Sequence, residues 1–286
     1  MSPLISISGL NKFYRKNHVL QDINLNVEAG QILGLVGPNG AGKTTCLQAL
    51  LGLTRYKGDI SVLGHNPSKH RTKMLESVAY IADVAVLPKW IKVSQALTYM
   101  EGVHPNFDGK KALAFLAKTN IPMSATVKAL SKGMVTQLHL ALILAVDAKV
   151  LVLDEPTLGL DILTRRQFYN HLLEDFHNDD KCIIITTHQI EEIEHILTDV
   201  AFIKDGQIVV NESVEGIRSR FKLLAVTNEN LAAAKAFAPI CVNNMLGLTS
   251  MLFDDADFDA LASIGQVSSP SLADVFVGIM TQEGVK

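Results

Sequence analysis

Residues 37–44 read Gly-Pro-Asn-Gly-Ala-Gly-Lys-Thr and fit the pattern G-x-x-x-x-G-K-[ST]. Glycines let a backbone pass close to phosphate oxygens because they have no Cβ, and the backbone N–H groups can then point at an anion. The helix that follows such a loop adds the positive end of its dipole. We therefore expect Gly37, Asn39, Gly40 and Gly42 to form a phosphate-binding loop.

Three side chains at the end of this loop could bind the rest of a nucleoside triphosphate. The ammonium of Lys43 could reach the β- and γ-phosphates, and the Thr44 hydroxyl could ligate Mg²⁺. Thr45 could add a hydrogen bond to a phosphate. A plain glycine-rich turn is the alternative. The apolar run before the loop and the helical pattern after it favour nucleotide binding, because the phosphate-binding motif needs both.

A pair of acids, Asp154 and Glu155, follows a second apolar run. Ligands of open parallel sheets bind at the carboxyl ends of the strands, so we expect this pair beside the phosphate loop. Asp154 would then hold Mg²⁺, and Glu155 would orient or deprotonate the water that attacks the γ-phosphate. Two solvated acids at a strand end are the alternative, which the phosphate loop makes the weaker interpretation.

The sheet that must position these groups is predicted by apolar runs at 32–36, 150–153 and 182–186. Such runs are typical of strands that are buried on both faces. Helical patterns follow at 44–53 and 163–177. Strands that alternate with helices predict an α/β fold with a mainly parallel sheet, of the P-loop nucleoside triphosphatase type.

The remaining regions have different patterns. Alternating apolar residues between 5 and 27 predict an antiparallel β subdomain. Residues at about 88–146 have helical periodicity and predict a helical insertion. Short strand and helix patterns follow residue 220. We expect a nucleotide-binding domain at 1–220 and a small α/β accessory domain at 221–286.

Composition narrows the class of protein. Of the 286 residues 48% are hydrophobic, yet no run reaches the roughly 18 apolar residues of a membrane span, and the N-terminus has no signal-peptide pattern. The 26 basic and 29 acidic residues give a net charge of -3, so we expect no nucleic acid partner. Three widely spaced cysteines indicate reduced thiols rather than a disulfide framework or a zinc site.

Further motifs appear in a fixed order along the chain: Leu-Ser-Lys-Gly-Met at 130–134, Gly-Leu-Asp at 159–161 and Thr-Thr-His at 186–188. With them, residues 4–220 resemble the ATP-binding subunits of ABC transporters. In this resemblance the first motif takes the place of the signature, the second that of the D-loop, and His188 that of the switch histidine. The resemblance implies that Ser131, Gly133 and Asp161 contact nucleotide, and that Tyr14 stacks on adenine.

The resemblance also implies the mechanism and the partners. Two ATP-binding subunits, in a homodimer or a heterodimer, pair head to tail and hold two ATP molecules between them. Each ATP contacts the phosphate loop of one subunit and the signature helix of the other, and Mg²⁺ is the cofactor. A separate integral membrane permease carries the substrate. We expect the chain at the cytoplasmic face of a bacterial plasma membrane.

Two departures from the family pattern stand out. Asp83 occupies the place of a glutamine that binds the metal and the water, and it could reach Mg²⁺ or be a solvated loop acid. Lys132 replaces a signature glycine and could add positive charge near ATP or point into solvent. The variant signature resembles a bacterial branch that exports peptides, antibiotics or hydrophobic compounds. The sequence Ser-Leu-Ala-Asp-Val-Phe at 271–276 resembles a terminal motif of the same branch.

Other interpretations remain open at this stage. The apolar Val84, Val86, Leu87 and Trp90 could receive a helix of the permease or could be local core. A soluble ABC-type ATPase that acts as a mechanical switch on nucleic acid or protein is the alternative function, although the chain lacks the second ATP module or long insertion typical of those proteins. A subunit that binds ATP without turnover is disfavoured, because the residues expected to catalyse hydrolysis are present.

Overall fold

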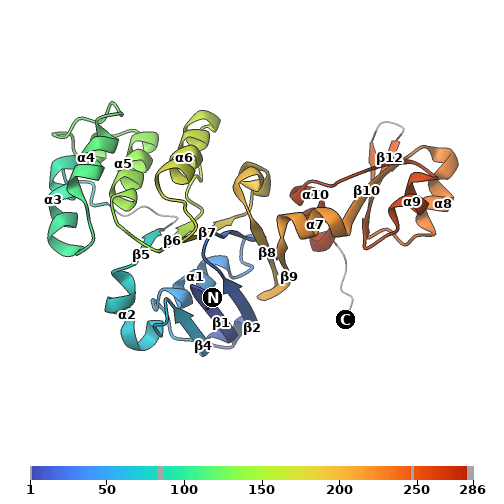
Figure 1. Cartoon of the computed structure of the whole chain (residues 1–286), viewed down its shortest axis with the longest axis horizontal. Helices are drawn as coiled ribbons and strands as arrows, with labels where there is room; N and C mark the ends of the chain where they lie inside the picture. Colours follow the sequence, from blue (N-terminus) through green and yellow to red (C-terminus); the bar gives the residue numbers. More distant parts are fainter. Residues whose placement is uncertain (1, 83–86, 246–247, 282–286) are drawn as a thin grey trace.

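The computed structural model of the chain describes residues 2–82, 87–245 and 248–281. Within these ranges the strands form three sheets, of six, three and four strands. In Figure 1 the molecule has a large lobe on the left and a smaller lobe, made of C-terminal residues, on the right.

The six-stranded sheet has the strand order β5-β6-β7-β3-β8-β9. Its strands are β3 (Ile32–Val36), β5 (Val78–Ile81), β6 (Val150–Asp154), β7 (Cys182–Thr187), β8 (Asp199–Lys204) and β9 (Gln207–Ser213). Neighbouring strands run parallel except β8 and β9, which pair antiparallel. All residues of β3, β6 and β7 are buried. The carboxyl ends of these three strands therefore lie side by side.

An antiparallel sheet with the order β2-β1-β4 lies on one side of the large sheet. Its strands are β1 (Ile5–Tyr14), β2 (Asn17–Val27) and β4 (Lys57–Val62), and α1 (Lys43–Leu50) packs between the two sheets. Buried side chains of β1, β2, β4 and α1 form one hydrophobic core with one face of the large sheet. The short helix α2 (Pro67–Leu75) follows β4.

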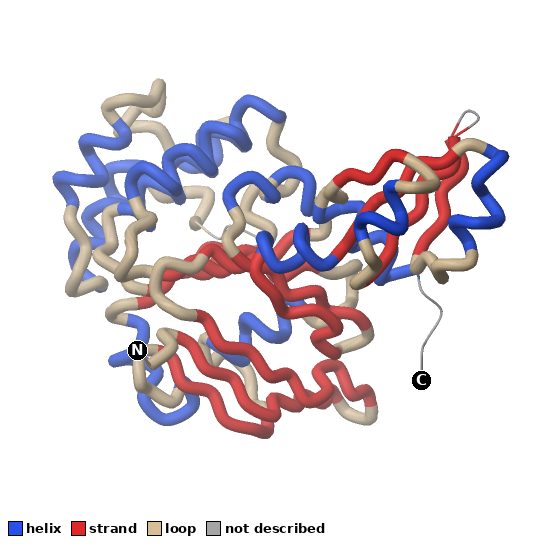
Figure 2. The backbone as a smooth tube through the Cα atoms, turned by 45° about the vertical axis from the view of Figure 1, so that its right-hand side comes forward, coloured by secondary structure: helices blue, strands red, loops and turns tan. Residues whose placement is uncertain are grey.

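Helices cover the other face of the large sheet, as Figures 1 and 2 show. They are α5 (Lys132–Leu144) and α6 (Ile162–Asp175), with the 3-10 helix η1 (Val127–Ala129) before α5. Beside them, α3 (Val93–Val103) and α4 (Gly109–Leu116) pack against α5. Three of them begin at residues that suit this position. The side chains of Asp108, Ser131 and Asp161 accept hydrogen bonds from backbone N–H groups in the first turns of α4, α5 and α6.

The C-terminal residues form the third sheet, with the antiparallel order β11-β12-β10-β13. Its elements are α7 (Val214–Arg220), β10 (Phe221–Val226), η4 (Asn228–Asn230), α8 (Leu231–Lys235), β11 (Cys241–Met245), β12 (Leu248–Asp254), α9 (Phe258–Ala262), β13 (Gln266–Ser268) and α10 (Leu272–Thr281). One face of this sheet has a small core of its own, which includes Leu224, Met251 and Phe253.

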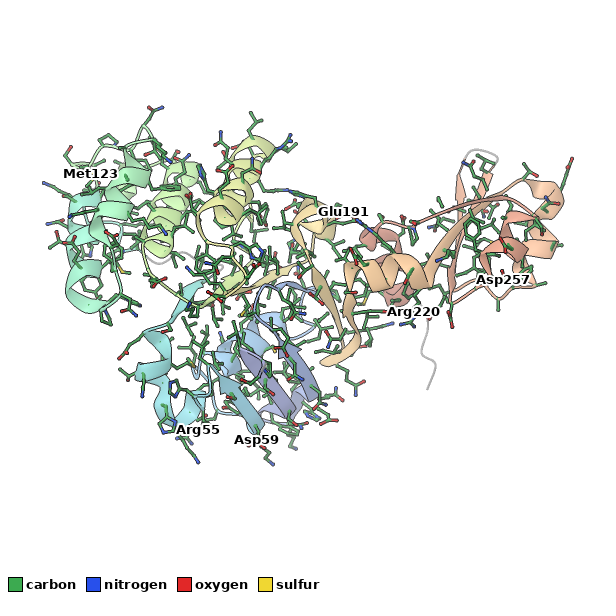
Figure 3. The ribbon with its side chains drawn as sticks, in the orientation of Figure 1. Arg55, Asp59, Met123, Glu191, Arg220 and Asp257 are labelled. Atoms are coloured by element: carbon green, nitrogen blue, oxygen red, sulfur yellow. The ribbon has the colours of Figure 1, made fainter. Side chains whose placement is uncertain are left out.

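The last helix returns to the large lobe. Leu272 and Val275 of α10 are fully buried in the main core, and α10 packs against η2 (Ile190–Glu192), which η3 (Glu194–Ile196) follows. The rings of Phe276 and Phe202 meet edge to face with centroids 5.3 Å apart. In Figure 3 Arg220 lies where the two lobes meet, and its guanidinium forms two hydrogen bonds to Asp254, at 2.6 and 2.7 Å.

The structure confirms the predicted α/β fold and the strands expected at 32–36, 150–153 and 182–186. The helix expected at 44–53 ends earlier, at Leu50, because Gly52 has a φ of 65° that ends the helical path. The helix expected at 163–177 begins one residue earlier, at Ile162 directly after its Asp161 cap, and ends at Asp175. The strands β4, β8, β9, β11 and β13 were not predicted. Among the described residues, no helix is both long enough and apolar enough to cross a membrane.

Candidate active site

The phosphate loop at 37–44 lies between β3 and α1. Two of its glycines have no room for a side chain. A Cβ on Gly37 would lie 2.5 Å from the carbonyl oxygen of Ile203, and a Cβ on Gly42 would lie 2.7 Å from Cδ2 of Leu20. Gly42 also has a φ of 108°, which glycine adopts at little cost. The fold of the loop thus requires these glycines before any ligand is considered.

Lys43 curls back over this loop and is only 6% exposed. Its ammonium donates hydrogen bonds to the carbonyl oxygens of Gly37, at 2.7 Å, and Pro38, at 3.3 Å. Nζ also lies 3.5 Å from Oε1 of Glu155. A cation held at this point is placed to meet the phosphates that the loop would bind.

Asp154, at the end of β6, is 1% exposed and lies beside the loop. Its Oδ1 accepts hydrogen bonds from the hydroxyls of Thr44, at 3.2 Å, and Thr186, at 2.6 Å. Carboxylate and hydroxyl oxygens are ligands that Mg²⁺ prefers, so this pair of side chains fits the ion. Thr186 was not predicted. Its only signal in the sequence is its place at the end of the next buried strand, two residues before His188.

Glu155 has a φ of 48°, in the left-handed region that residues other than glycine rarely adopt. Thr186 supports this conformation, since the N–H of Glu155 lies 3.2 Å from the Thr186 carbonyl oxygen and 3.1 Å from its hydroxyl. The carboxylate then accepts a hydrogen bond from Nδ1 of His188 at 2.9 Å. The strained backbone therefore turns the Glu155 carboxylate toward Lys43 on one side and His188 on the other.

Lys43, Glu155 and His188 line one cleft of about 480 Å³. The lining residues are Val19, Asn39, Gly40, Gly42, Lys43, Thr44, Thr45, Glu155, Leu158 and His188. The structure thus brings Glu155 and His188 together with the predicted residues of the phosphate loop except Gly37. Asp154 is not among the described lining residues either, but it is bonded to Thr44, which is. Val19 and Leu158 were not predicted, because a single aliphatic residue at a strand or loop position has no signal of its own.

Tyr14 is not among the residues described as lining this cleft. Its ring is 44% exposed and lies under the ammonium of Lys12, whose Nζ is 4.5 Å from the ring centroid. The same ammonium donates hydrogen bonds of 2.6 Å to the Thr54 hydroxyl and the Arg55 carbonyl. The stacking of Tyr14 on adenine stays a prediction.

Ser131 and Gly133 lie at the start of α5, and they too are absent from the described lining of the cleft. The Ser131 hydroxyl accepts a hydrogen bond from the N–H of Met134 at 3.2 Å. Between them, the ammonium of Lys132 reaches over Gly159 in the loop that follows Glu155. Lys132 also lines a hollow that includes Glu155 and Leu158, although its side chain as a whole is exposed.

Asp161 caps α6, and it is likewise not among the described residues that line the cleft. Its carboxylate accepts hydrogen bonds from the Thr164 N–H, at 3.0 Å, and the Thr164 hydroxyl, at 2.7 Å. The hydrogen bond from that hydroxyl is the main reason that the pKa of Asp161 is lowered. Asp83, the other predicted metal ligand, lies outside the described residues.

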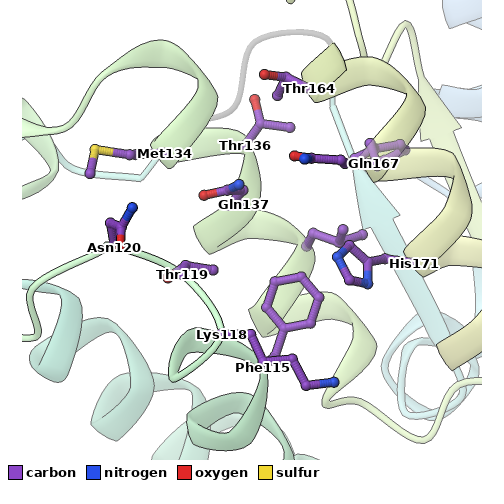
Figure 4. A pocket seen from close by; sticks show the side chains of 12 residues that line it. Phe115, Lys118, Thr119, Asn120, Met134, Thr136, Gln137, Thr164, Gln167 and His171 are labelled. Atoms are coloured by element: carbon purple, nitrogen blue, oxygen red, sulfur yellow. The ribbon is translucent and has the colours of Figure 1, made fainter.

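A second cavity, of about 420 Å³, lies between α5 and α6 (Figure 4). Thr136 and Gln137 of α5 face Gln167 and His171 of α6 across it. None of the predicted site residues is among the described residues that line it.

Comparison with known proteins agrees with this geometry. The family model described as "ABC transporter" matches residues 20–158. The lantibiotic transport ATP-binding protein SrtF of Streptococcus pyogenes is 30% identical over 221 residues, which cover 74% of this chain and 92% of that protein. The ABC transporter ATP-binding protein YtrB of Bacillus subtilis is 28% identical over 241 residues, which cover 83% of this chain and 82% of that protein.

Two further comparisons give a relative named for export and a solved structure. The Nod factor export ATP-binding protein I of Ralstonia nicotianae is 33% identical over 220 residues, which cover 72% of this chain and 66% of that protein. A solved structure described as the ATP binding subunit of an ABC transporter superposes with a TM-score of 0.70 at 22% identity. It covers 76% of this chain and 92% of its own, and it shows that the fold is shared.

Proposed function

Since the chain belongs to the family of ABC transporter ATP-binding proteins and is an ATPase, we propose that it powers export of a peptide, an antibiotic or another hydrophobic compound through a separate membrane protein. ATP hydrolysis is carried by the meeting of Lys43, Asp154, Glu155 and His188 at the carboxyl ends of three neighbouring strands. Export is supported by the relatives named for lantibiotic transport and Nod factor export.

Different residues of the cleft would bind the phosphates, orient the water and accept its proton during hydrolysis. The loop N–H groups and Lys43 bind the phosphates, and Lys43 neutralises charge that develops on the γ-phosphate. Glu155 orients the attacking water and accepts its proton, so that ATP and water become ADP and phosphate. His188 holds the Glu155 carboxylate through the bond at 2.9 Å. Lys43 lies on the other side of the same carboxylate, with Nζ 3.5 Å from Oε1.

Thr44 and Asp154 would hold Mg²⁺ in this cleft. Their oxygens already face each other at 3.2 Å, and Asp154 is almost fully buried. When bound, the ion supplies positive charge to the phosphate oxygens. Asp83 is proposed as a further ligand from the sequence alone.

The site would be completed by a second subunit, in a homodimer or a heterodimer. Lys43 and Glu155 line the cleft, whereas Ser131, Gly133 and Asp161, at the starts of α5 and α6, are not among the described residues that line it. A head-to-tail pair would bring the Ser131 hydroxyl and the N-terminus of the partner's α5 to the γ-phosphate. We also propose that residues 1–220 are the ATP-binding domain, with a helical subdomain at about 88–146, and that 221–286 are an accessory domain with its own sheet.

The permease would bind beside the helical subdomain. Trp90 is 74% exposed and is free to contact a partner, whereas Leu87 packs against the main core. Val84 and Val86 lie outside the described residues. Trp90 is therefore the residue of this group that we propose for docking, at the cytoplasmic face of a bacterial plasma membrane.

The test is to recover the tagged chain from its own cells with and without Lys43→Ala. We expect the chain in the membrane fraction, captured together with an integral membrane protein, and we expect Lys43→Ala to remain there while export stops. Trp90→Glu should release the chain from the membrane fraction and leave its ATP binding intact. Recovery with ribosomes or DNA, and with no integral membrane protein, would favour the mechanical-switch alternative and contradict the proposal.

A further inference from the structure

The loop that joins Glu155 to α6 is bonded to α6 near the start of the loop. The hydroxyl of Tyr169 lies 3.1 Å from the hydroxyl of Thr157, and these residues are 1% and 5% exposed. Burial raises the pKa of Tyr169 to about 12, so its proton stays available for this hydrogen bond. The first part of the loop is thus fixed to the helix directly after Glu155.

Arg165, one turn earlier on α6, holds the other end of the loop. Its Nη2 donates a hydrogen bond of 3.2 Å to the carbonyl oxygen of Leu160. Its Nη1 forms an ion pair with Glu192, and the two side chains are only 20% and 17% exposed. One guanidinium therefore serves a loop carbonyl and a carboxylate at once, which its planar set of donors permits and a lysine ammonium does less well.

Glu192 belongs to η2, which follows His188 closely in the chain. The neighbouring Ile190 and Ile193 are 2% and 0% exposed and belong to the main core. The segment after His188 is thus anchored by burial, and α10 packs against it from the C-terminal side.

Together these contacts form a closed chain of connections that includes Glu155 and His188. The chain runs from Glu155 through the loop to Leu160, crosses Arg165 to Glu192, and returns through η2 to His188, whose Nδ1 donates to Glu155. Without the Arg165 side chain, these contacts would no longer link the loop to η2. His188 and Glu155 would then vary more in their relative position, and catalysis is sensitive to displacements of this kind.

We propose that Arg165 is a positioning residue for ATP hydrolysis, which joins the loop at 157–161 to the segment after His188 and so fixes Glu155 against His188. This inference rests on the proposed function, because it assumes that Glu155 and His188 act on the attacking water.

The experiment compares Arg165→Gln, Glu192→Gln and the double variant in the full chain. Arg166→Gln and Glu191→Gln are the matched controls, since Arg166 and Glu191 are the exposed neighbours of the same charge. For each variant kcat, KM for ATP, ATP affinity and Tm are measured. We expect each single variant to lower kcat by about 10-fold while KM and ATP affinity stay within about twofold, because the phosphate loop is untouched. The double variant should lose no more than the larger single loss, because both substitutions break one link.

Three results would overturn the inference: single variants with the kcat of their controls, losses that multiply in the double variant, or an ATP affinity that falls with kcat. Glu155→Gln, assayed in the same series, distinguishes failure of the Arg165 inference from failure of the proposed function. If Glu155→Gln loses turnover and Arg165→Gln does not, only the assignment of Arg165 fails. If Glu155→Gln keeps turnover, the proposed function fails, and the inference falls with it.

Discussion

At the scale of single residues, Thr186 orients both acids of the site. Its hydroxyl donates to Asp154 Oδ1 at 2.6 Å and lies 3.1 Å from the N–H of Glu155. The acids were predictable, since a carboxylate directly after an apolar run has few other roles beside a phosphate loop. Thr186 was not, because a threonine at a strand end is common and only the pairing of β6 with β7 brings it to Asp154.

Replacing Thr186 with valine keeps the shape and removes both hydrogen bonds. Thr186 is 0% exposed, so Asp154 loses a partner that water cannot easily replace. We expect the free energy of unfolding to fall by about 1–3 kcal/mol and kcat to fall, since Glu155 loses support for its left-handed backbone. Urea unfolding and ATPase assays measure the two effects. Thr186→Ser, which keeps the hydroxyl, is the control, and equal behaviour of the two variants would refute this role.

Thiol reactivity tests the burial of Cys46 in α1 and Cys182 in β7. Burial raises the pKa values of Cys46 and Cys182 to about 12, while Cys241 is partly exposed. Because the thiolate is the reactive form, we expect one thiol to react with an aromatic disulfide at pH 8 in the folded chain. The other two should react only after unfolding. Rapid reaction of all three thiols would contradict the packing of α1 and β7.

At the scale of elements, three central strands of the large sheet could be predicted from their apolar sequences. β3, β6 and β7 are mostly apolar and fully buried, whereas β9 has three apolar residues followed by three polar ones and only one buried position. The turn Asp205-Gly206, with φ of 49° and 79°, joins β8 to β9, and an Asp-Gly pair of this kind is a hairpin signal that could have predicted both strands. The face of the sheet on which the Tyr14 side chain lies could not be predicted from the sequence. Register irregularities in β1 interrupt the alternation of side chains between the two faces of the strand.

Helix α10 belongs to the main core, so a cavity there should weaken the whole chain. Leu272 is 0% exposed, and we expect Leu272→Ala to lower the free energy of unfolding by about 2–5 kcal/mol. Leu248 is 53% exposed in the C-terminal sheet, and Leu248→Ala should cost less than about 0.5 kcal/mol. Denaturant unfolding measures both values. A loss at Leu272 as small as that at Leu248 would show that α10 does not contribute to this core.

At the scale of the whole molecule, large apolar side chains in the loop that follows Glu155 and at the start of α6 are exposed to solvent within the described chain. Ile162 and Leu163, directly after Asp161, are 80% and 74% exposed. Large apolar groups at such exposure are typical of an interaction surface. Their position beside the cleft supports a dimer in which this loop meets the second subunit.

Ile162→Glu should therefore prevent ATP-dependent dimerisation, because a carboxylate would be buried in the contact without a partner. The measurement is molar mass by light scattering, with ATP, in a Glu155→Gln background that retains the nucleotide. Val103→Glu is the control, since Val103 is 56% exposed on α3, away from the phosphate loop. Dimerisation that persists in Ile162→Glu, or that is lost equally in Val103→Glu, would contradict this interface.

The central claim is that Glu155 acts on the attacking water in the cleft that binds ATP. The most direct test is the rate of ATP hydrolysis by the full chain and by Glu155→Gln, measured with ATP affinity in the same preparation. We predict that kcat falls by at least about 100-fold while ATP affinity is unchanged, because glutamine keeps the shape of the side chain and cannot accept the proton. An unchanged rate of hydrolysis in Glu155→Gln would contradict the account.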